Sequence, residues 1–296
     1  MPLNTKYIFF GTPEFAAIIL EKLIDAGYIP EAVVCNSDKP VGRKKIITPP
    51  PAKQKILNLE SVIKNKIKIF QPEKLDSSIK YQVSSIKPDF FIVAAYNKIL
   101  PKEILEIPRL GTIGVHPSLL PKHRGTTPIQ TAILNGDEIT GTTIFLIDEK
   151  MDHGKIVSSI KCLVSSNDNY GILMKKLAEL SADLLIETLS KFIKGEIKPQ
   201  PQDESQATYT KKFKIEDAFI KPEDLKKAQT VGGEIASSIE RKIRALNPEP
   251  GVFTIINDKR IKFLESKIQD NKLKLIKIQK QGKKPQALTG NLNSHV

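Results

Sequence analysis

The sequence predicts an α/β domain with a mostly parallel sheet, followed by a small domain of short strands that forms a β-barrel. Two observations carry this prediction. Short apolar runs alternate with helical segments over the first part of the chain, which is the pattern of βαβ units. Towards the C-terminus the apolar runs become shorter and turn residues separate them at close spacing, which is typical of a small barrel.

The first domain begins with a strand over residues 6–10 and a helix over residues 14–26, with Pro13 near the first helical turn. Further apolar runs predict strands at residues 31–35, 66–70, 90–94, 112–115, 142–147 and 156–164. Helices are expected at residues 77–86 and 169–193. Because strands and helices alternate, most strands of this sheet should run parallel.

Residues 195–207 are expected to form a linker, because prolines and polar residues replace the apolar pattern there. The second domain should contain a helix over residues 231–246 and strands at residues 252–256, 260–264 and 272–278. The chain is therefore divided into a first domain at residues 1–194, the linker, and a basic second domain at residues 208–296.

The chain is basic, with 46 Lys and Arg against 33 Asp and Glu and a formal net charge of +13. Residues 191–296 hold 22 of the basic residues and only 13 acidic ones. Such a balance favours acidic partners, nucleic acid first. The apolar runs are too short to span a bilayer, and two cysteines do not make a disulfide framework. We therefore expect a cytoplasmic protein that has no membrane partner. A monomer is the expected oligomeric state, although these observations do not bear on it.

The segment from Gly111 to Pro128 has the strongest chemical character. A predicted strand ends at His116, and an irregular, proline-containing loop follows it. Sites of open α/β sheets lie beyond the carboxyl ends of the strands, so His116 is placed at such an edge. Asp152 follows another apolar run and should reach the same edge. A histidine can move a proton in acyl transfer to an amine, while a carboxylate fixes its tautomer.

At this point the sequence resembles a known family. Residues Ser118 to Pro128 resemble the SLLPxxRGxxP motif of the folate-dependent formyltransferases, with His116 before the motif and Asp152 after it. The wider resemblance is to the methionyl-tRNA formyltransferases and covers almost the whole chain. It is carried, in the family's order, by residues 10–16, 38–43, 99–102, 108–111, 202–204, 207–209 and 243–251.

The resemblance implies a sheet domain that binds 10-formyltetrahydrofolate and an OB-like C-terminal barrel that binds initiator methionyl-tRNA. It implies His116 and Asp152 as catalytic residues. The folate would be held by Asn97, Lys98, Ile99, Leu100, Ser118, Leu119, Leu120 and Pro121. The tRNA would be contacted by a basic loop that contains Lys39, Arg43, Lys44 and Lys45. The implied activity is transfer of a formyl group to the methionyl amino group, which supports translation initiation.

One departure from the family pattern lies beside the expected catalytic histidine. The family has Asn two residues before this histidine, where the present chain has Gly114. The loss of one donor to a developing oxyanion typically costs about a hundred- to a thousand-fold in rate. Asn97 and His153 also differ from the family pattern. We consider a replacement donor from Asn97, which would fill the space beside Gly114, an ordered water, or, less favoured, His153.

Other interpretations remain open at this stage. His116, His123 and His153 could form a metal site, but their spacing matches no short metal motif, so no metal is expected. The basic loop could be a solvated surface segment, although nearby prolines and Gly42 favour a projecting loop that contacts RNA. The chain could instead formylate an amino sugar, which would not need the basic segments. It could also be a tRNA-binding homologue whose catalysis is impaired by Gly114.

Overall fold

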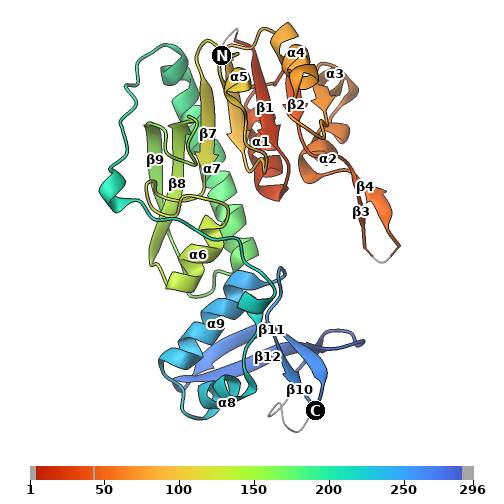
Figure 1. The fold of residues 1–296 in the computed structure, drawn as a ribbon, viewed down its shortest axis with the longest axis vertical. Coiled ribbons are helices and arrows are strands. Elements are labelled where there is room, and N and C mark those ends of the chain that lie inside the picture. The colour runs from red at the N-terminus through yellow and green to blue at the C-terminus, as the bar shows by residue number, and fades with distance from the viewer. Residues whose placement is uncertain (1–4, 43, 289–296) are drawn as a thin grey trace. The chain divides into compact units, whose positions relative to one another are not determined.

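The computed structural model describes residues 5–42 and 44–288, and its first part is built on one seven-stranded sheet (Figure 1). The strand order is β5-β2-β1-β6-β7-β8-β9. These strands are β1 (Tyr7–Gly11), β2 (Ala32–Val34), β5 (Lys68–Phe70), β6 (Phe90–Ala94), β7 (Thr112–His116), β8 (Ile139–Leu146) and β9 (Ile156–Leu163). All pairs from β5 to β7 are parallel, and β8 is antiparallel to β7. The predicted mostly parallel sheet is confirmed.

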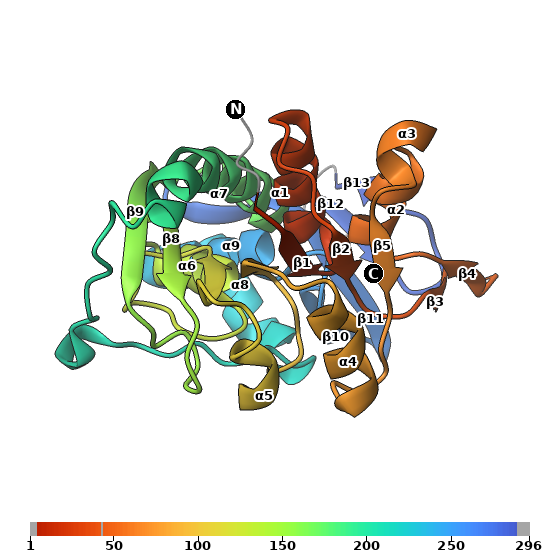
Figure 2. The ribbon, with the colours of Figure 1, turned by 90° about the horizontal axis from the view of Figure 1, so that it is seen from above.

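Helices cover both faces of this sheet, as the view from above shows (Figure 2). On one face lie α1 (Glu14–Asp25) and α7 (Tyr170–Ile193), and on the other α4 (Ser77–Ser85) and α5 (Lys102–Leu105). Burial on both faces explains why β1 and β7 are buried along their whole length. Short helices α2 (Pro51–Leu57) and α3 (Ser61–Lys64), which the apolar pattern does not predict, precede β5.

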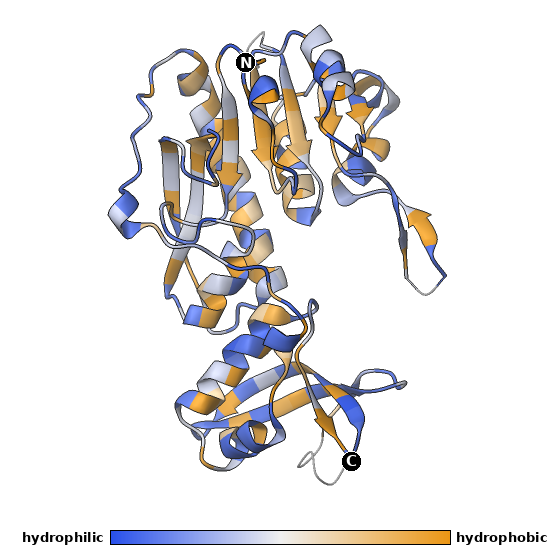
Figure 3. Ribbon diagram, viewed as in Figure 1, coloured by the Kyte–Doolittle hydropathy of each residue, from blue (hydrophilic) through white to orange (hydrophobic). Residues whose placement is uncertain are grey.

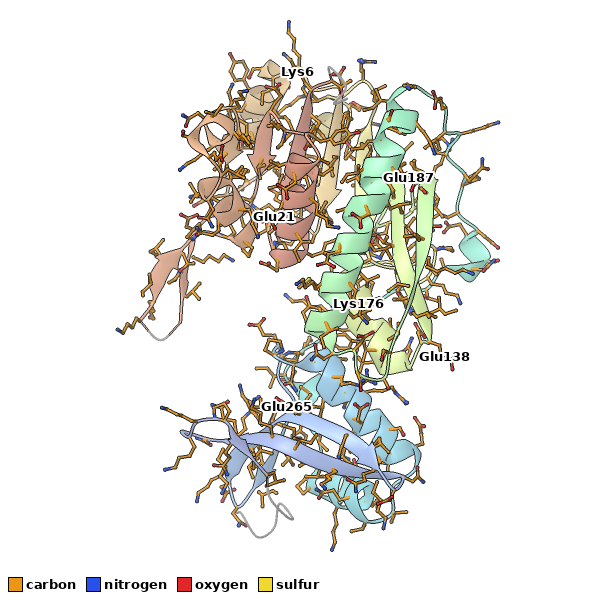
Figure 4. The ribbon with its side chains drawn as sticks, turned by 180° about the vertical axis from the view of Figure 1, so that it is seen from behind. Lys6, Glu21, Glu138, Lys176, Glu187 and Glu265 are labelled. Carbon is orange, nitrogen blue, oxygen red and sulfur yellow. The ribbon has the colours of Figure 1, made fainter. Side chains whose placement is uncertain are left out.

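The helix α7 packs on the sheet through a stripe of buried residues that recurs every fourth position, at Leu177, Ser181, Leu185 and Leu189. Ser181 Oγ lies 2.7 Å from the hydroxyl of Thr142 on β8, which ties the helix to the sheet. On the side that faces away from the sheet, α1 and α7 carry charged side chains such as Glu21, Lys176 and Glu187 (Figure 4).

Among the described residues, no helix is both long and apolar enough to cross a membrane.

The expected basic loop is a β-hairpin that projects from the sheet domain (Figure 1). Its strands are β3 (Lys39–Val41) and β4 (Ile46–Thr48). Asp38 anchors the base of the hairpin, because its carboxylate accepts hydrogen bonds from Lys53 at 2.9 Å and from Gln71 at 2.8 Å. These hydrogen bonds lower the pKa of the Asp38 carboxyl group. The hydropathy colours mark apolar residues on the hairpin (Figure 3). The side chains of Val41, Ile46 and Ile47 are exposed.

The stretch expected to be a linker is bonded to the sheet domain. Gln200 and Ile156 exchange two backbone hydrogen bonds, at 2.7 and 2.8 Å. After the short helix η1 (Glu204–Gln206), the Thr208 N–H donates to the Pro121 carbonyl at 3.2 Å, and the Arg124 N–H donates to the Thr208 carbonyl at 2.8 Å. Residues 195–207 therefore belong to the same compact unit as the sheet.

The C-terminal strands form an antiparallel sheet, in the order β10 (Phe253–Ile256), β11 (Lys259–Gln269), β12 (Lys272–Lys280) and β13 (Gln286–Ala287). The predicted domain of short antiparallel strands is confirmed. Beyond these four strands, Phe253 of β10 forms a parallel bridge with Phe219, and the Ile220 N–H donates to the Phe253 carbonyl at 2.8 Å. The core of this sheet includes Ile261, Phe263, Leu273 and Leu275.

Three helices and a short turn accompany this sheet: α6 (Pro128–Asn135), η2 (Glu216–Ala218), α8 (Pro222–Thr230) and α9 (Glu234–Leu246). Arg241 of α9 donates from Nε to the Leu134 carbonyl at the end of α6, at 3.2 Å. Contacts group residues 125–139, 163–173 and those from 210 onward into one unit, and residues up to 124, 140–162 and 174–209 into another. The functional boundaries at residues 194 and 208 stay a prediction.

The antiparallel pairing of β7 with β8 determines which side chain packs against Gly114. Gly114 lies directly opposite Phe145, which is only 3% exposed. A Cβ atom at Gly114 would lie 2.4 Å from Cε1 and 2.6 Å from Cζ of the Phe145 ring. The same atom would lie 3.0 Å from Cγ1 of Ile147. Phe145 therefore occupies the position that a side chain at Gly114 would take, and Asn97 as a replacement donor stays a prediction.

This packing predicts that Gly114→Ala destabilises the protein by about 1–3 kcal/mol, because a buried ring must move to admit one methyl group. The same change should cost clearly less in a Phe145→Leu background, whose shorter side chain leaves the space open. Thermal denaturation of the four variants measures this coupling. Gly171→Ala serves as a control, since its nearest neighbour is Asn169 Oδ1 at 3.5 Å. Equal costs of Gly114→Ala in both backgrounds would contradict the packing account.

Candidate active site

His116 is the last residue of β7, at the carboxyl edge of the sheet where the sequence predicts it. Its side chain is buried, with 6% of the residue exposed. Nε2 of His116 lies 2.9 Å from the carbonyl oxygen of His123. Because a carbonyl oxygen can only accept, Nε2 carries the proton of this hydrogen bond. The free lone pair of a neutral His116 is therefore on Nδ1.

The structure brings Asp152 to His116, as expected. Its Oδ2 atom lies 3.6 Å from Nδ1 of His116, and its side chain is 21% exposed. This separation is slightly longer than a direct hydrogen bond. The tautomer of His116 is fixed by the His123 carbonyl, whereas from the sequence we expect Asp152 to fix it. The Asp152 carboxylate therefore lies beside the nitrogen that can exchange a proton.

The motif loop after His116 is held by its own hydrogen bonds and by β8. Ser118 is fully buried, and its hydroxyl donates to the Lys122 carbonyl at 2.6 Å. Thr143 of β8 donates to the Ser118 carbonyl at 2.7 Å and accepts from the Leu120 N–H at 3.0 Å. The side chain of Ser118 therefore shapes the loop.

Arg124 of the motif is fully buried. Its guanidinium donates to the Oε1 atom of Gln202 from Nε at 3.1 Å and from Nη2 at 2.7 Å. It also donates to the two carboxylate oxygens of Glu204, at 2.6 and 2.9 Å, and to the Tyr209 hydroxyl at 3.1 Å. These contacts use all five N–H donors that an arginine has. The hydrogen bond to Glu204 raises the pKa of Arg124 and lowers the pKa of the Glu204 carboxyl group.

Gln202 connects Arg124 to the turn that carries Asp152. Its Nε2 atom donates to the carbonyl oxygens of Asp152 and Gly154, both at 2.8 Å. Gly154 allows the same turn to pack closely against Leu146. A Cβ atom at position 154 would lie 1.7 Å from the Leu146 carbonyl oxygen, so only glycine fits there. Gln202 and Glu204 are expected from the sequence to lie in a linker, so their part in this site was missed. The signal in the sequence was Arg124 itself, the arginine of the motif, which needs acceptors for its N–H groups.

His153 faces acidic side chains. Its Nδ1 atom lies 2.6 Å from Oδ2 of Asp148, and its Nε2 atom lies 3.6 Å from Oε1 of Glu204. These contacts account for the side chain and give no support to a role as replacement donor for the formyl oxygen. The described residues hold no cluster of three His, Cys, Asp or Glu side chains placed to bind a metal ion.

The loop after β6 presents its predicted residues in different ways. Asn97 accepts a hydrogen bond from Nδ2 of Asn36 at 2.9 Å. Lys98 donates to the backbone carbonyls of residues 72 and 73, which holds the loop against the end of β5. Leu100 is buried in the core, whereas Ile99 is 85% exposed. Because β6 and β7 are parallel neighbours, this loop and His116 leave the sheet at the same edge.

The predicted tRNA-contacting residues lie on the hairpin, well separated in sequence from the motif loop. Lys39 is on β3, and Lys44 and Lys45 are at the tip, all three exposed. The backbone N–H of Lys45 donates to the Gly42 carbonyl at 3.1 Å, which closes the turn. Arg43 lies outside the described residues.

Comparison with known proteins bears on these residues. A family model described as "Formyl transferase" matches residues 5–189, and one described as "Formyl transferase, C-terminal domain" matches residues 234–274. A protein of Kosmotoga olearia named methionyl-tRNA formyltransferase is 43% identical over 90% of this chain and 81% of its own length. The protein of the same name from Bacillus subtilis is 39% identical over 89% of this chain and 79% of its own length.

Solved structures share the fold at lower identity. Methionyl-tRNA formyltransferase from Clostridium thermocellum superimposes with a TM-score of 0.59 at 17% identity, over 97% of this chain and all of that one. An N-formyltransferase of Helicobacter canadensis, solved with folinic acid and dTDP-3-aminofucose, gives a TM-score of 0.63 at 20% identity, over 90% of this chain and 88% of that one. From the family models and the relatives near 40% identity, the chain belongs to the formyl transferase family.

Proposed function

We propose that the chain transfers a formyl group from 10-formyltetrahydrofolate to the amino group of initiator methionyl-tRNA, in support of translation initiation. The observation that carries this proposal is the pairing of buried His116 with Asp152 beside the motif loop, in a chain about 40% identical to proteins named methionyl-tRNA formyltransferase. The folate supplies the formyl group. Transfer forms one carbon–nitrogen bond to the methionyl amine and breaks one carbon–nitrogen bond to the folate.

The residues of the site suit this chemistry. Nδ1 of His116 is the nitrogen able to take a proton from the attacking amine and return it to the departing folate nitrogen, because Nε2 is engaged by the His123 carbonyl. The Asp152 carboxylate at 3.6 Å stabilises the protonated histidine that this step creates. The folate residues are Asn97 to Leu100 and Ser118 to Pro121. The exposed apolar side chain of Ile99 fits an aromatic ligand at this edge, while Lys98 fixes its loop.

The tRNA contacts are assigned to the hairpin and to the basic C-terminal residues. Lys39, Lys44 and Lys45 place positive charge on a projecting element whose base is fixed by Asp38, and Arg43 is assigned to the same tRNA contact from the sequence. The segment from residue 208 onward, which we propose as the tRNA-binding domain, carries much of the chain's positive charge along β11 and β12. An amino-sugar substrate would need neither element. We further propose a cytoplasmic monomer.

The catalytic assignment predicts that His116→Ala lowers the kcat of formyl transfer to charged initiator tRNA by about 10²–10⁴-fold, the usual contribution of a positioned acid–base group. The assay follows the formylation of methionyl-tRNA with 10-formyltetrahydrofolate, and filter binding follows tRNA affinity, which should not change. Wild-type protein that formylates an amino sugar but not the tRNA would overturn the proposed substrate. Wild-type protein that binds the tRNA without turnover would identify a homologue impaired by Gly114.

The hairpin assignment predicts that Arg43→Ala raises the KM for tRNA or lowers kcat with tRNA, and leaves folate binding unchanged. Lys80→Ala, which removes an exposed charge on α4, is the matched control and should change neither. Steady-state kinetics with each substrate varied in turn separates the two effects. An effect confined to folate affinity would contradict the assignment of Arg43 to tRNA.

The charge on β11 and β12 predicts a salt-dependent contribution to tRNA binding. Replacing Lys267, Lys272 and Lys274 together by Gln should weaken binding and reduce the slope of log affinity against log salt by about 0.7–0.9 for each phosphate that these lysines neutralise. Binding titrations at several salt concentrations measure this slope. An unchanged slope would show that these lysines do not contact phosphates of the tRNA.

A further inference from the structure

Asp152 adopts a backbone conformation that requires support. Its φ angle is +49°, in the left-handed region that residues with a Cβ atom seldom occupy. Such conformations persist where surrounding contacts over-determine them, and they cluster at functional sites. The turn that contains Asp152 therefore depends on the groups bonded to it.

The side chain of Gln202 is such a group, and its orientation is unambiguous. Arginine can only donate, so the Gln202 oxygen must face Arg124. Carbonyl oxygens can only accept, so the Gln202 nitrogen must face Asp152 and Gly154. Each end of the amide makes the two hydrogen bonds that it can make. A glutamate of the same shape would keep the contact to Arg124 but would point an oxygen at two carbonyl oxygens.

The same contacts form a closed circuit around the catalytic pair. His116 donates to the carbonyl of His123, and the next residue along the chain is Arg124. Arg124 donates to Gln202, and Gln202 donates to the backbone of Asp152. The Asp152 carboxylate then faces Nδ1 of His116 at 3.6 Å. Gln202 thus lies on a hydrogen-bonded path that joins the backbone of Asp152 to the loop that contacts His116.

We propose that Gln202 is a positioning residue for Asp152. Gln202 holds the Asp152 carboxylate at its working distance from His116 and contacts neither substrate. This inference rests on the proposed formyl transfer. Displacement of a catalytic group by about 1 Å can cost as much as a hundred-fold in rate. Through Gln202 alone, the connection between the two predicted domains supports the position of Asp152.

Gln202→Glu is the direct test. Its kcat for formyl transfer should fall by about ten- to a hundred-fold, while the KM values for folate and tRNA stay within about two-fold of wild type. Gln200→Glu is the matched control, since the Gln200 side chain donates only to the Lys198 carbonyl among its described contacts. It should keep the wild-type kcat. An equal loss in both variants would contradict the proposal.

A second background separates positioning from general stability. In Asp152→Ala protein, single-turnover transfer should be slowed little further by Gln202→Glu, because no carboxylate remains to be positioned. The melting temperature should respond to Gln202→Glu in the same way in both backgrounds. A full additional loss of rate in the Asp152→Ala background would show that Gln202 does not act through Asp152.

Amide hydrogen exchange tests the role of Gln202 without relying on the formyl-transfer assay. Amides of residues 148–156 should exchange faster in Gln202→Glu than in wild type and should be unaffected in Gln200→Glu. If wild-type protein fails to transfer formyl groups, the proposed function falls, yet this measurement still decides whether Gln202 holds the turn. Unchanged exchange in Gln202→Glu would overturn the proposal for Gln202 alone.

Discussion

The hydrogen bonds of Arg124 to the chain segment from Gln202 to Tyr209 are the constraint on which the site depends. A buried guanidinium is costly unless every donor finds a partner, and here all five N–H groups do. Lysine has neither the planar fork nor the number of fixed directions that Gln202, Glu204 and Tyr209 require. Glu204 remains half in water, so the geometry of the hydrogen bonds matters more here than the attraction of the charges.

This constraint links three stretches of chain that are distant in sequence. The motif loop supplies His123 and Arg124, the turn after β8 supplies Asp152, and the connection supplies Gln202. Each stretch is irregular backbone, which would be mobile by itself. Held together, they fix the tautomer of His116 and the distance of its Nδ1 atom from Asp152. The rigid sheet thus provides the position of β7, and the hydrogen bonds beyond the sheet provide the reactive geometry.

Much of the first domain follows from sequence patterns, because strands buried on both faces are continuous apolar runs, as at Phe90–Ala94. The structure brings His116 and Asp152 together as the sequence predicts, because both stand at the ends of such runs. The role of Gln202 was not predictable in this way. A polar, proline-containing stretch has the same composition whether it is a flexible linker or a segment that is hydrogen-bonded to the sheet domain. The partner of Gly114 also depends on the register of β7 and β8, which places Phe145 opposite it and which composition does not encode.

The positioning role of Gln202 requires the connection that carries this residue to be bonded to the sheet domain in the free protein. Amide hydrogen exchange of the unliganded chain measures this, because the N–H groups of Arg124, Ile156, Gln200 and Thr208 all make hydrogen bonds between the connection and the sheet domain. We expect slow exchange at all four positions, comparable with that of the sheet strands. Exchange there as fast as at exposed Lys44 would show that the connection is not bonded to the sheet domain, and the positioning role of Gln202 would then fail.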